Sequence, residues 1–582
     1  ERYARARPLL PRIAGWLALR EARITSDPAL AETLATRAPE AARPLALLVL
    51  AEVKLRTGDS LGAERLLVEG GRPDRAALLA LARGDTAGAR ARAVAAVSSA
   101  DTAVQRAGLA VIEGPAAAVP GPPDEWSAAA AAAGRLGEAT RAARLAALAV
   151  AEGDSGPGML VRWGTYLERA GRRSEALVAY ARAGRAGEFP HARALLQSDR
   201  PGGLRALRAF AETWPDDPRA PLALYLVADA TDSDSLLARV AERWPTTDYG
   251  VRARQRLAMT RLSRRDTAGA LRYFEAGARA GASDAPLSQF HAGRLLLARG
   301  DSAGRALLER VARTDSLGYY GFQARAALGM SPPVLVPVAE HPPAPRARAV
   351  LEEIAQLEAA GLSEEADRLV AHVGERPWED ADEMLDVAMG LIASGRSVAG
   401  IRLGWRAATR LTLNHPRVLR AVFPWPYREL VEQEAAKFKL DPFLLAGLIR
   451  QESGFGADAR SRAGAVGAMQ LMPATAREVA RRQGVPWSDG MRAIFDANIH
   501  IGSVHLAGLL ARYQGDVIPA VAAYNAGGSP VSRWLRVPGA RDRLMLVEQI
   551  RYPETQGYVR TVWRNRELYR ALYGSAAATG NP

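Results

Sequence analysis

One glutamate near the C-terminal end of this sequence is well suited to acid–base chemistry. Asp441, followed by proline, predicts a helix start, because a carboxylate caps the first turn and proline tolerates the first helical position. Leu445, Leu448 and Glu452 then lie at i, i+3 and i+7, so the carboxyl shares the apolar face. Burial and the negative end of the helix dipole both raise a carboxyl pKa, which keeps a general acid protonated near neutral pH. On this helix alone, a salt bridge between Glu452 and a neighbouring arginine is the simpler explanation.

A series of short motifs accompanies this glutamate. The first is Arg-Gln-Glu-Ser at 450–453, the second is Ala-Gly-Ala-Val-Gly-Ala-Met-Gln-Leu-Met-Pro at 463–473, and the third is Ala-Tyr-Asn-Ala-Gly at 523–527; a shorter Asn-Ile pair at 498–499 lies between the second and the third. In this order they resemble the motifs of soluble lytic transglycosylases, which are lysozyme-like enzymes that cleave peptidoglycan. The resemblance is strong over about 421–570 and weaker over the rest of the chain.

The resemblance implies a role for each matching residue. Glu452 would be the sole catalytic acid/base: it would protonate the oxygen between N-acetylmuramic acid and N-acetylglucosamine, then accept the proton of the muramyl C6 hydroxyl. That hydroxyl attacks within its own sugar, which gives a 1,6-anhydro ring instead of a hydrolysed end. Ser461 would steady the glutamate or the muramyl N-acetyl group. The residues expected to bind the glycan are Ser453, Ser461, Met469, Gln470, Met472, Tyr524, Asn525, Glu554 and Tyr558.

Some of these residues also have a purely structural interpretation, and the chain departs from the family pattern at two places. Met469 and Met472 are suited to core packing, and Tyr524-Asn525 before glycines is also a common way to end a helix. The family usually has Pro-Gly after the third motif, where this chain has Gly528-Ser529-Pro530. It usually has Arg-Asn where this chain has Gln556-Gly557. The missing arginine removes an expected contact beside the groove.

Two other functions stay open from the sequence. Hydrolysis on the same fold needs a second carboxyl, about 5–5.5 Å from the first in a retaining enzyme and farther away in an inverting one. The candidates for that carboxyl are Asp458, Asp496 and Glu554. The other function is a non-catalytic cell-wall-binding scaffold, in which the helices bind partners and the terminal domain holds glycan.

The rest of the chain predicts an all-α protein. Apolar positions recur at three- and four-residue spacing through residues 1 to about 330. A punctuation of Gly or Arg, then Asp, then Ser or Thr recurs at 58–63, 84–89, 265–270 and 300–304; the glycine suits the end of one helix and the aspartate caps the next. The small residues that follow predict a close approach of two helices. We therefore expect an N-terminal α-superhelical solenoid of helical hairpins, similar to tetratricopeptide repeats, with an ordinary globular helical domain as the alternative.

The proline-rich stretch 329–346 predicts an extended linker or a strand-like wrap, because its prolines do not fit the interior of a helix. We expect an α-superhelical domain at 1–335 and a helical linker domain at 346–420. We expect a mainly α, lysozyme-like catalytic domain at 421–582. The resemblance implies a U-shaped or ring-shaped superhelical domain.

Composition excludes several kinds of chemistry. The 582 residues contain no cysteine, which excludes disulfides, thiol nucleophiles and cysteine–zinc sites. The net charge of 77 − 63 = +14 comes almost entirely from arginine, as a GC-rich genome would produce, and no compact basic run with interleaved aromatics predicts nucleic-acid binding. The seven histidines lack metal-binding spacing, and no phosphate loop is present, so we expect neither a metal nor a cofactor.

The sequence also bears on location and partners. No stretch approaches the roughly 20 apolar residues that span a bilayer, so we expect no transmembrane segment in this chain. No signal peptide opens the chain at Glu1, so an export signal would lie outside this sequence. The resemblance implies peptidoglycan glycan strands as substrate, other cell-wall enzymes as partners, and a periplasmic location in a Gram-negative cell.

Overall fold

The computed structural model describes residues 2–119, 121–280, 285–333, 335, 342–461 and 463–574. Its regular structure over these residues is helical; two isolated β-bridges, Arg460–Val466 and Val466–Leu471, are the exceptions. The predicted all-α class is therefore confirmed. The contacts divide the chain into two compact units. The first holds the chain up to Ser233 with Glu353–His372, and the second holds Asp234–Glu352 with the chain from Val373 onwards.

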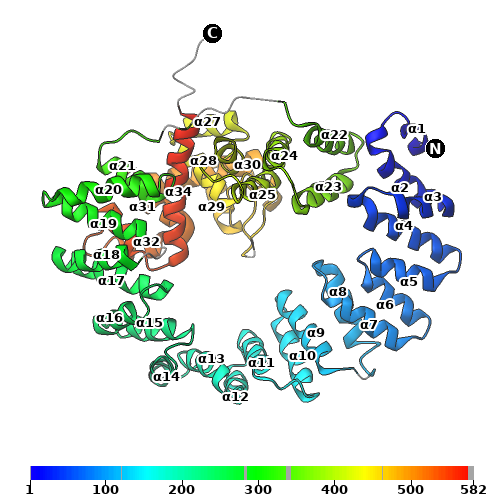
Figure 1. Ribbon diagram of the computed structural model, residues 1–582, viewed down its shortest axis with the longest axis horizontal. Coiled ribbons are helices and arrows are strands. Elements are labelled where there is room, and N and C mark those ends of the chain that lie inside the picture. Colours follow the sequence, from blue (N-terminus) through cyan, green and yellow to red (C-terminus); the bar gives the residue numbers. More distant parts are fainter. Residues whose placement is uncertain are drawn as a thin grey trace, which may run out of the picture. The chain divides into compact units, whose positions relative to one another are not determined.

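The first unit is mainly a succession of short helices, each packed against its neighbours in the chain (α1 to α15, blue through cyan to blue-green in Figure 1). A core cluster that runs from Ala77 to Ala194 is rich in alanine, which lets the helix backbones approach closely. This is the pairwise packing predicted for a solenoid of helical hairpins. The helices are α1 (Arg2–Ala6), η1 (Pro11–Ile13), α2 (Ala14–Thr25), α3 (Pro28–Arg37), η2 (Glu40–Ala42), α4 (Arg43–Arg56), α5 (Ser60–Glu69), α6 (Pro73–Ala82), α7 (Thr86–Val97), α8 (Thr102–Glu113), α9 (Pro123–Arg135), α10 (Ala139–Ala151), α11 (Pro157–Arg169), α12 (Arg173–Arg182), α13 (Arg185–Leu195), α14 (Arg200–Thr213) and α15 (Ala220–Ala230), with parts of α22 (Pro345–Ala359) and α23 (Ser363–Glu375).

The second unit joins further helical hairpins to the C-terminal helices. Within it, α28 lies along α34, α31 packs against α34, and α21 packs against α34 as well. Its helices are α16 (Asp234–Arg243), α17 (Asp248–Ser263), α18 (Thr267–Ala280), α19 (Ala285–Ala298), α20 (Ser302–Thr314), α21 (Tyr319–Ala327), α24 (Ala381–Ala393), α25 (Ser397–Ala408), α26 (Pro416–Val422), α27 (Arg428–Lys437), α28 (Pro442–Glu452), α29 (Pro473–Gln483), η3 (Asp489–Ala493), α30 (Phe495–Arg512), α31 (Val517–Ala526), α32 (Gly528–Trp534), α33 (Arg543–Gln549) and α34 (Pro553–Tyr573). The domain boundaries expected at 335/346 and 420/421 stay predictions.

The recurring Gly-Asp motif ends one helix and caps the next, as the sequence predicts, but its small residues differ in their role. Gly84 has a φ of +80°, and the Asp85 carboxylate accepts a hydrogen bond from the Gly88 N–H at 2.8 Å. A Cβ on Gly88 would lie 2.1 Å from the Asp85 Oδ2 atom, so this glycine makes room for the cap and not for a second helix. At Gly304 a Cβ would lie 2.3 Å from the Leu297 backbone N, which is the predicted close approach of two helices.

The proline-rich stretch is shorter than predicted at its C-terminal end. Pro345 is the first residue of α22, where its missing N–H leaves no intrahelical hydrogen bond unmade. Positions 334 and 336–341 of the predicted linker, and the last positions of the chain, 575–582, lie outside the described residues. Among the helices that the structure describes, none is long and apolar enough to cross a membrane.

Gly304 and Gly158 form a matched pair for testing the helix packing. Both lie in the first turn of a helix, but a Cβ on Gly158 meets nothing within 4 Å. We expect Gly304→Ala to lower the free energy of unfolding by about 1–3 kcal/mol through overpacking. Gly158→Ala should be neutral or slightly stabilising, because alanine is the better helix former. Thermal unfolding of the two variants measures the difference; equal melting temperatures would contradict the close approach at Gly304.

Candidate active site

The helix that carries Glu452 begins where the sequence predicts. The Asp441 carboxylate accepts a hydrogen bond from the Phe443 N–H at 2.9 Å and also binds Arg566 and Arg570 of α34, at 2.6 and 2.7 Å. The cap therefore fixes the start of α28 and joins it to α34. The predicted apolar face of α28 is fully buried, which leaves Glu452 half-buried as the last residue of the helix.

Burial dominates the electrostatics of Glu452. It raises the pKa of this carboxyl to about 7, and a hydrogen bond donated by the Tyr558 hydroxyl to Oε1 offsets part of the rise, because the bond stabilises the ionised form. The alternative of a salt bridge to a neighbouring arginine is not what the described residues show. The Arg450 guanidinium donates through Nε to the Val422 carbonyl at 2.7 Å. Glu452 is thus a partly exposed carboxyl that holds its proton well above the usual pH range of a glutamate and exchanges it near neutral pH.

The turn after Glu452 is held by backbone geometry and by one hydroxyl. Gly454 and Phe455 have φ values of +63° and +66°, and the Phe455 ring is buried. The Ser453 hydroxyl donates to the Ala468 carbonyl at 2.7 Å and accepts from the Gly456 N–H at 3.1 Å. Ser453 therefore fastens the second motif beside the glutamate.

Asn498 organises the second motif. Its Oδ1 atom accepts from the Met469 N–H at 2.8 Å, and its Nδ2 atom donates to the carbonyls of Val466 and Arg492, at 3.0 and 2.7 Å. Asn498 is fully buried, and Gly467 leaves the room it needs, since a Cβ there would lie 2.2 Å from Nδ2. A buried amide with three partners gives this loop a single conformation.

The three predicted side chains of the second motif differ in exposure. Met469 is fully buried and packs against Gly502 of α30. The Gln470 amide donates to the carbonyls of Ala459 and Gly467, so it braces its own loop. Met472 is 41% exposed and is therefore available to a ligand.

The third motif ends α31 and contacts the same loop. The Tyr524 hydroxyl donates to the Met469 carbonyl at 2.9 Å, and the Asn525 side chain accepts from the Thr555 hydroxyl at 2.7 Å. Burial raises the pKa of Tyr524 well above its ordinary value, and the negative charge of Glu452 raises it further. Tyr524 and Tyr558, the two tyrosines that face Glu452, are therefore neutral hydrogen-bond donors across the physiological pH range.

The remaining predicted residues lie at the surface. The Ser461 hydroxyl accepts from the Ala465 N–H at 2.9 Å, and its side chain is exposed; among the described residues it makes no hydrogen bond to Glu452. Glu554 is exposed on the first turn of α34. The other two carboxyls considered for a hydrolase, Asp458 and Asp496, are exposed as well.

Sequence reasoning missed the residues that hold the site together. It named Asn498 without a role and gave no role to Thr555, Arg566 or Arg570. Their partners lie tens of residues away or more, so short-range patterns carry no signal for them. Gln556, noted only as a departure from the family, donates to the carbonyls of Val547 and Glu548 at the end of α33.

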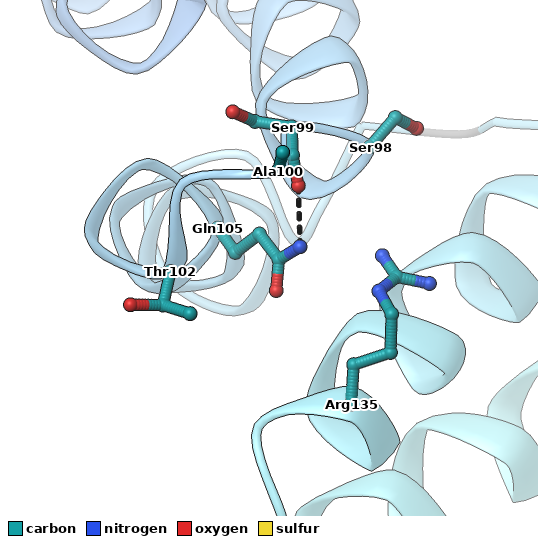
Figure 2. A pocket seen from close by; sticks show the side chains of 6 residues that line it. All are labelled: Ser98, Ser99, Ala100, Thr102, Gln105 and Arg135. Carbon is teal, nitrogen blue, oxygen red and sulfur yellow. Dashed lines mark hydrogen bonds between the residues drawn. The ribbon is translucent and has the colours of Figure 1, made fainter. Parts of the chain in front are cut away.

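The first unit contains a polar pocket of its own. Ser98, Ser99, Ala100, Thr102, Gln105 and Arg135 line it (Figure 2). Its two longest polar side chains already bind backbone: the Gln105 amide donates to the Ser99 carbonyl, and Arg135 donates to the Val97 carbonyl. It holds none of the residues expected to do chemistry. Among the described residues, no group of three or more His, Cys, Asp or Glu side chains is placed to bind a metal.

Residues 429–546 match the family of the Transglycosylase SLT domain. The soluble lytic murein transglycosylase of Escherichia coli K12 is 32% identical over 155 residues, which is 26% of this chain and 24% of that protein. The aligned part thus spans about a quarter of the length of that curated relative. Glu452 and the second and third motifs lie within the matched residues.

Two solved structures share the fold over nearly the whole chain. The 70-kDa soluble lytic transglycosylase of E. coli has a TM-score of 0.63 at 19% identity, with 97% of each chain covered. An inactive mutant of the lytic transglycosylase Slt from Pseudomonas aeruginosa has a TM-score of 0.57 at 21% identity, with 100% of this chain and 95% of the other covered. The predicted combination of a helical superhelix and a lysozyme-like domain is confirmed at the level of the fold.

The raised pKa of Glu452 makes a prediction about stability. The folded carboxyl titrates near 7 and the unfolded one near 4.5, so the unfolded state loses its proton first as the pH rises. The free energy of unfolding therefore falls as the pH rises from about 4.5 to about 7. We expect Glu452→Gln to be more stable than the wild type by about 1–3 kcal/mol at pH 7.5, with the gain disappearing below pH ~4.5. Denaturant titrations at several pH values measure this.

The matched control is Glu429→Gln, which removes an exposed carboxyl from α27. It should give no pH-dependent gain of this kind. A Glu452→Gln variant that parallels this control at every pH would show that the Glu452 carboxyl is not shifted.

Proposed function

We propose that this protein is a peptidoglycan lytic transglycosylase in which Glu452 is the sole catalytic acid/base. The observation that carries the proposal is the half-buried Glu452 carboxyl at the end of α28, which lies within the residues that match the SLT domain. Its pKa is raised to about 7, and the Tyr558 hydroxyl donates a hydrogen bond to it. A carboxyl in this state can both give and take a proton near neutral pH. The 1,6-anhydro product is the part of the proposal that rests on the family resemblance.

The first step uses the protonated carboxyl. Glu452 donates its proton to the oxygen that links N-acetylmuramic acid to N-acetylglucosamine, and the bond from the muramyl C1 to that oxygen breaks. The N-acetylglucosamine side leaves as an alcohol, and positive charge develops at C1. The Glu452 carboxylate that remains stabilises this charge, and Tyr558 steadies the carboxylate through its hydrogen bond.

The second step uses the ionised carboxylate. Glu452 accepts the proton of the muramyl C6 hydroxyl while that oxygen attacks C1, which closes the 1,6-anhydro ring and returns the carboxyl to its protonated form. No water is consumed. Because the nucleophile belongs to the same sugar, its effective concentration is high, and no second carboxylate is needed to activate water. This suits a site in which Asp458, Asp496 and Glu554 are all exposed.

We assign the glycan-binding residues to two groups according to their contacts. The exposed side chains, Met472, Ser461 and Glu554, are available to contact glycan directly. The side chains that bind the protein itself shape the groove from behind. This second group contains Ser453, Met469, Gln470, Tyr524, Asn525 and Tyr558.

The substrate determines the location that we propose. Peptidoglycan lies outside the cytoplasmic membrane, so the protein would act in the periplasm of a Gram-negative cell. Its partners would be glycan strands, and association with other cell-wall enzymes stays a prediction.

Product analysis tests the reaction. We expect purified sacculi digested with the wild type to release muropeptides that end in 1,6-anhydro-N-acetylmuramic acid, as mass spectrometry detects. Glu452→Gln should lower turnover at least about a hundredfold, since it removes both the acid and the base. Glu429→Gln serves as the control and should keep wild-type turnover.

Other products would decide between the remaining functions. Ends carrying reducing N-acetylmuramic acid would show hydrolysis and contradict the transglycosylase proposal. Binding to sacculi with no turnover by the wild type would support the scaffold instead.

The pH dependence of turnover is a separate prediction. The free enzyme must hold Glu452 protonated for the first step, so kcat/KM should fall as the pH rises through about 7. Initial rates on a soluble muropeptide between pH 5 and 9 measure this. A falling limb centred near pH 4.5 would contradict the burial of this carboxyl.

A further inference from the structure

A buried carboxylate outside the proposed catalytic machinery joins the helical hairpins to the C-terminal helices. Glu548, near the end of α33, has a side chain that is 1% exposed. The Tyr320 hydroxyl of α21 donates to its Oε1 atom at 2.8 Å, and Arg560 of α34 binds its Oε2 atom. His291 Nε2 of α19 lies 3.7 Å from Oε1. One carboxylate on α33 thus joins α33 and α34 to α19 and α21, a pair of helices more than 200 residues earlier in the sequence.

Aromatic packing surrounds this ion pair. The Arg560 guanidinium lies 5.5 Å from the centre of the Tyr320 ring, and the rings of Tyr319 and Trp563 meet edge to face at 5.3 Å. Trp563 packs against the core formed by α17 to α21. Breaking such a buried pair leaves an uncompensated charge, so its geometry is strongly enforced.

Two faces of α34 contact different parts of the protein. Arg560 and Trp563 lie three residues apart and face the helical hairpins. Thr555 and Tyr558 lie on another face, where Thr555 binds Asn525 and Tyr558 binds Glu452. Because the helix is rigid over this short distance, the position of Arg560 sets the position of Tyr558.

A second contact fixes the start of α34 against α33. The Gln556 amide donates to the Val547 and Glu548 carbonyls, at 3.0 and 3.1 Å. Arg294 of α19 also binds Asp542, the residue that caps α33, at 2.9 Å. The hairpins therefore hold α33 at both of its ends.

We propose that Tyr320, acting through Glu548 and Arg560, is a positioning residue that keeps Tyr558 in hydrogen-bond contact with Glu452. The inference rests on the proposed function for its kinetic readout. It gives the helical hairpins a part in the chemistry, although Tyr320 lies outside the matched domain and does not touch the reacting atoms.

The test compares Tyr320→Phe with Tyr180→Phe. Tyr180 in α12 is buried and donates to Glu168 at 2.8 Å, so its variant loses an equivalent tyrosine–glutamate hydrogen bond in the first unit. We expect Tyr320→Phe to lower kcat by roughly 3- to 10-fold, the effect of one weakened hydrogen bond, with KM nearly unchanged. Tyr180→Phe should match the wild type.

The pH profile separates positioning from simple loss of stability. The titratable groups that face Glu452 among the described residues are Tyr558 on α34 and Tyr524 on α31. A loosened Tyr558 stabilises the ionised carboxyl less, so the falling limb of kcat/KM should move to higher pH by roughly half a unit to one unit. Hydrogen exchange should also accelerate over the first turns of α34.

Glu548→Gln provides a second variant with nearly the same side-chain volume. It leaves the Arg560 guanidinium without its carboxylate, and we expect the same pattern at larger amplitude. Thermal unfolding checks that each variant is folded. If Tyr320→Phe does not fold, the Glu548→Gln profile decides.

Each result supports or overturns the inference. A Tyr320→Phe variant that matches Tyr180→Phe in kcat, pH limb and exchange overturns it, and so does a change in KM alone. A wild type that releases no muropeptides from sacculi contradicts the proposed function instead. In that case exchange in α34 and direct titration of the Glu452 carboxyl, which need no substrate, still decide whether Tyr320 positions Tyr558.

Discussion

A carboxyl that loses its hydration without gaining a cation is the constraint on which the rest of this structure depends. Glu452 ends a buried helix, and among the described residues its environment supplies burial and one tyrosine hydroxyl. A paired arginine would make this group an ordinary ionised glutamate. Arginines of α28 and α34 bind other groups instead: Arg450 donates to the Val422 carbonyl, and Arg566 and Arg570 bind Asp441.

The loops around this carboxyl are built so that few of their groups can move. Asn498 binds one N–H and two carbonyls of the chain, and Tyr524 closes on the Met469 carbonyl. These hydrogen bonds hold the loop in place. A residue of the motif can therefore matter for the site without contacting a ligand itself. A rigid loop presents a bound ligand with a fixed surface, and that lowers the cost of orienting the reacting atoms.

Local patterns predicted local structure well. The start of α28 at Asp441-Pro442, the buried face that includes Leu445 and Leu448, and the aspartate caps between hairpins all depend on residues within one or two turns. The sequence could not predict contacts between distant residues, such as Tyr558 with Glu452 or Tyr320 with Glu548, because they depend on how helices pack. Pro345 was assigned to the linker for the same reason: the position where a helix starts depends on what the helix packs against.

The central claim is that Glu452 carries its proton near neutral pH, and its own titration tests this most directly. Infrared difference spectra of the wild type and Glu452→Gln, recorded across pH 4 to 9, isolate the carboxyl band of this one residue. We expect a protonated carboxyl band that disappears with a midpoint near pH 7. A midpoint near pH 4.5 would contradict it, because Glu452 would then be an ordinary carboxylate with no proton to give.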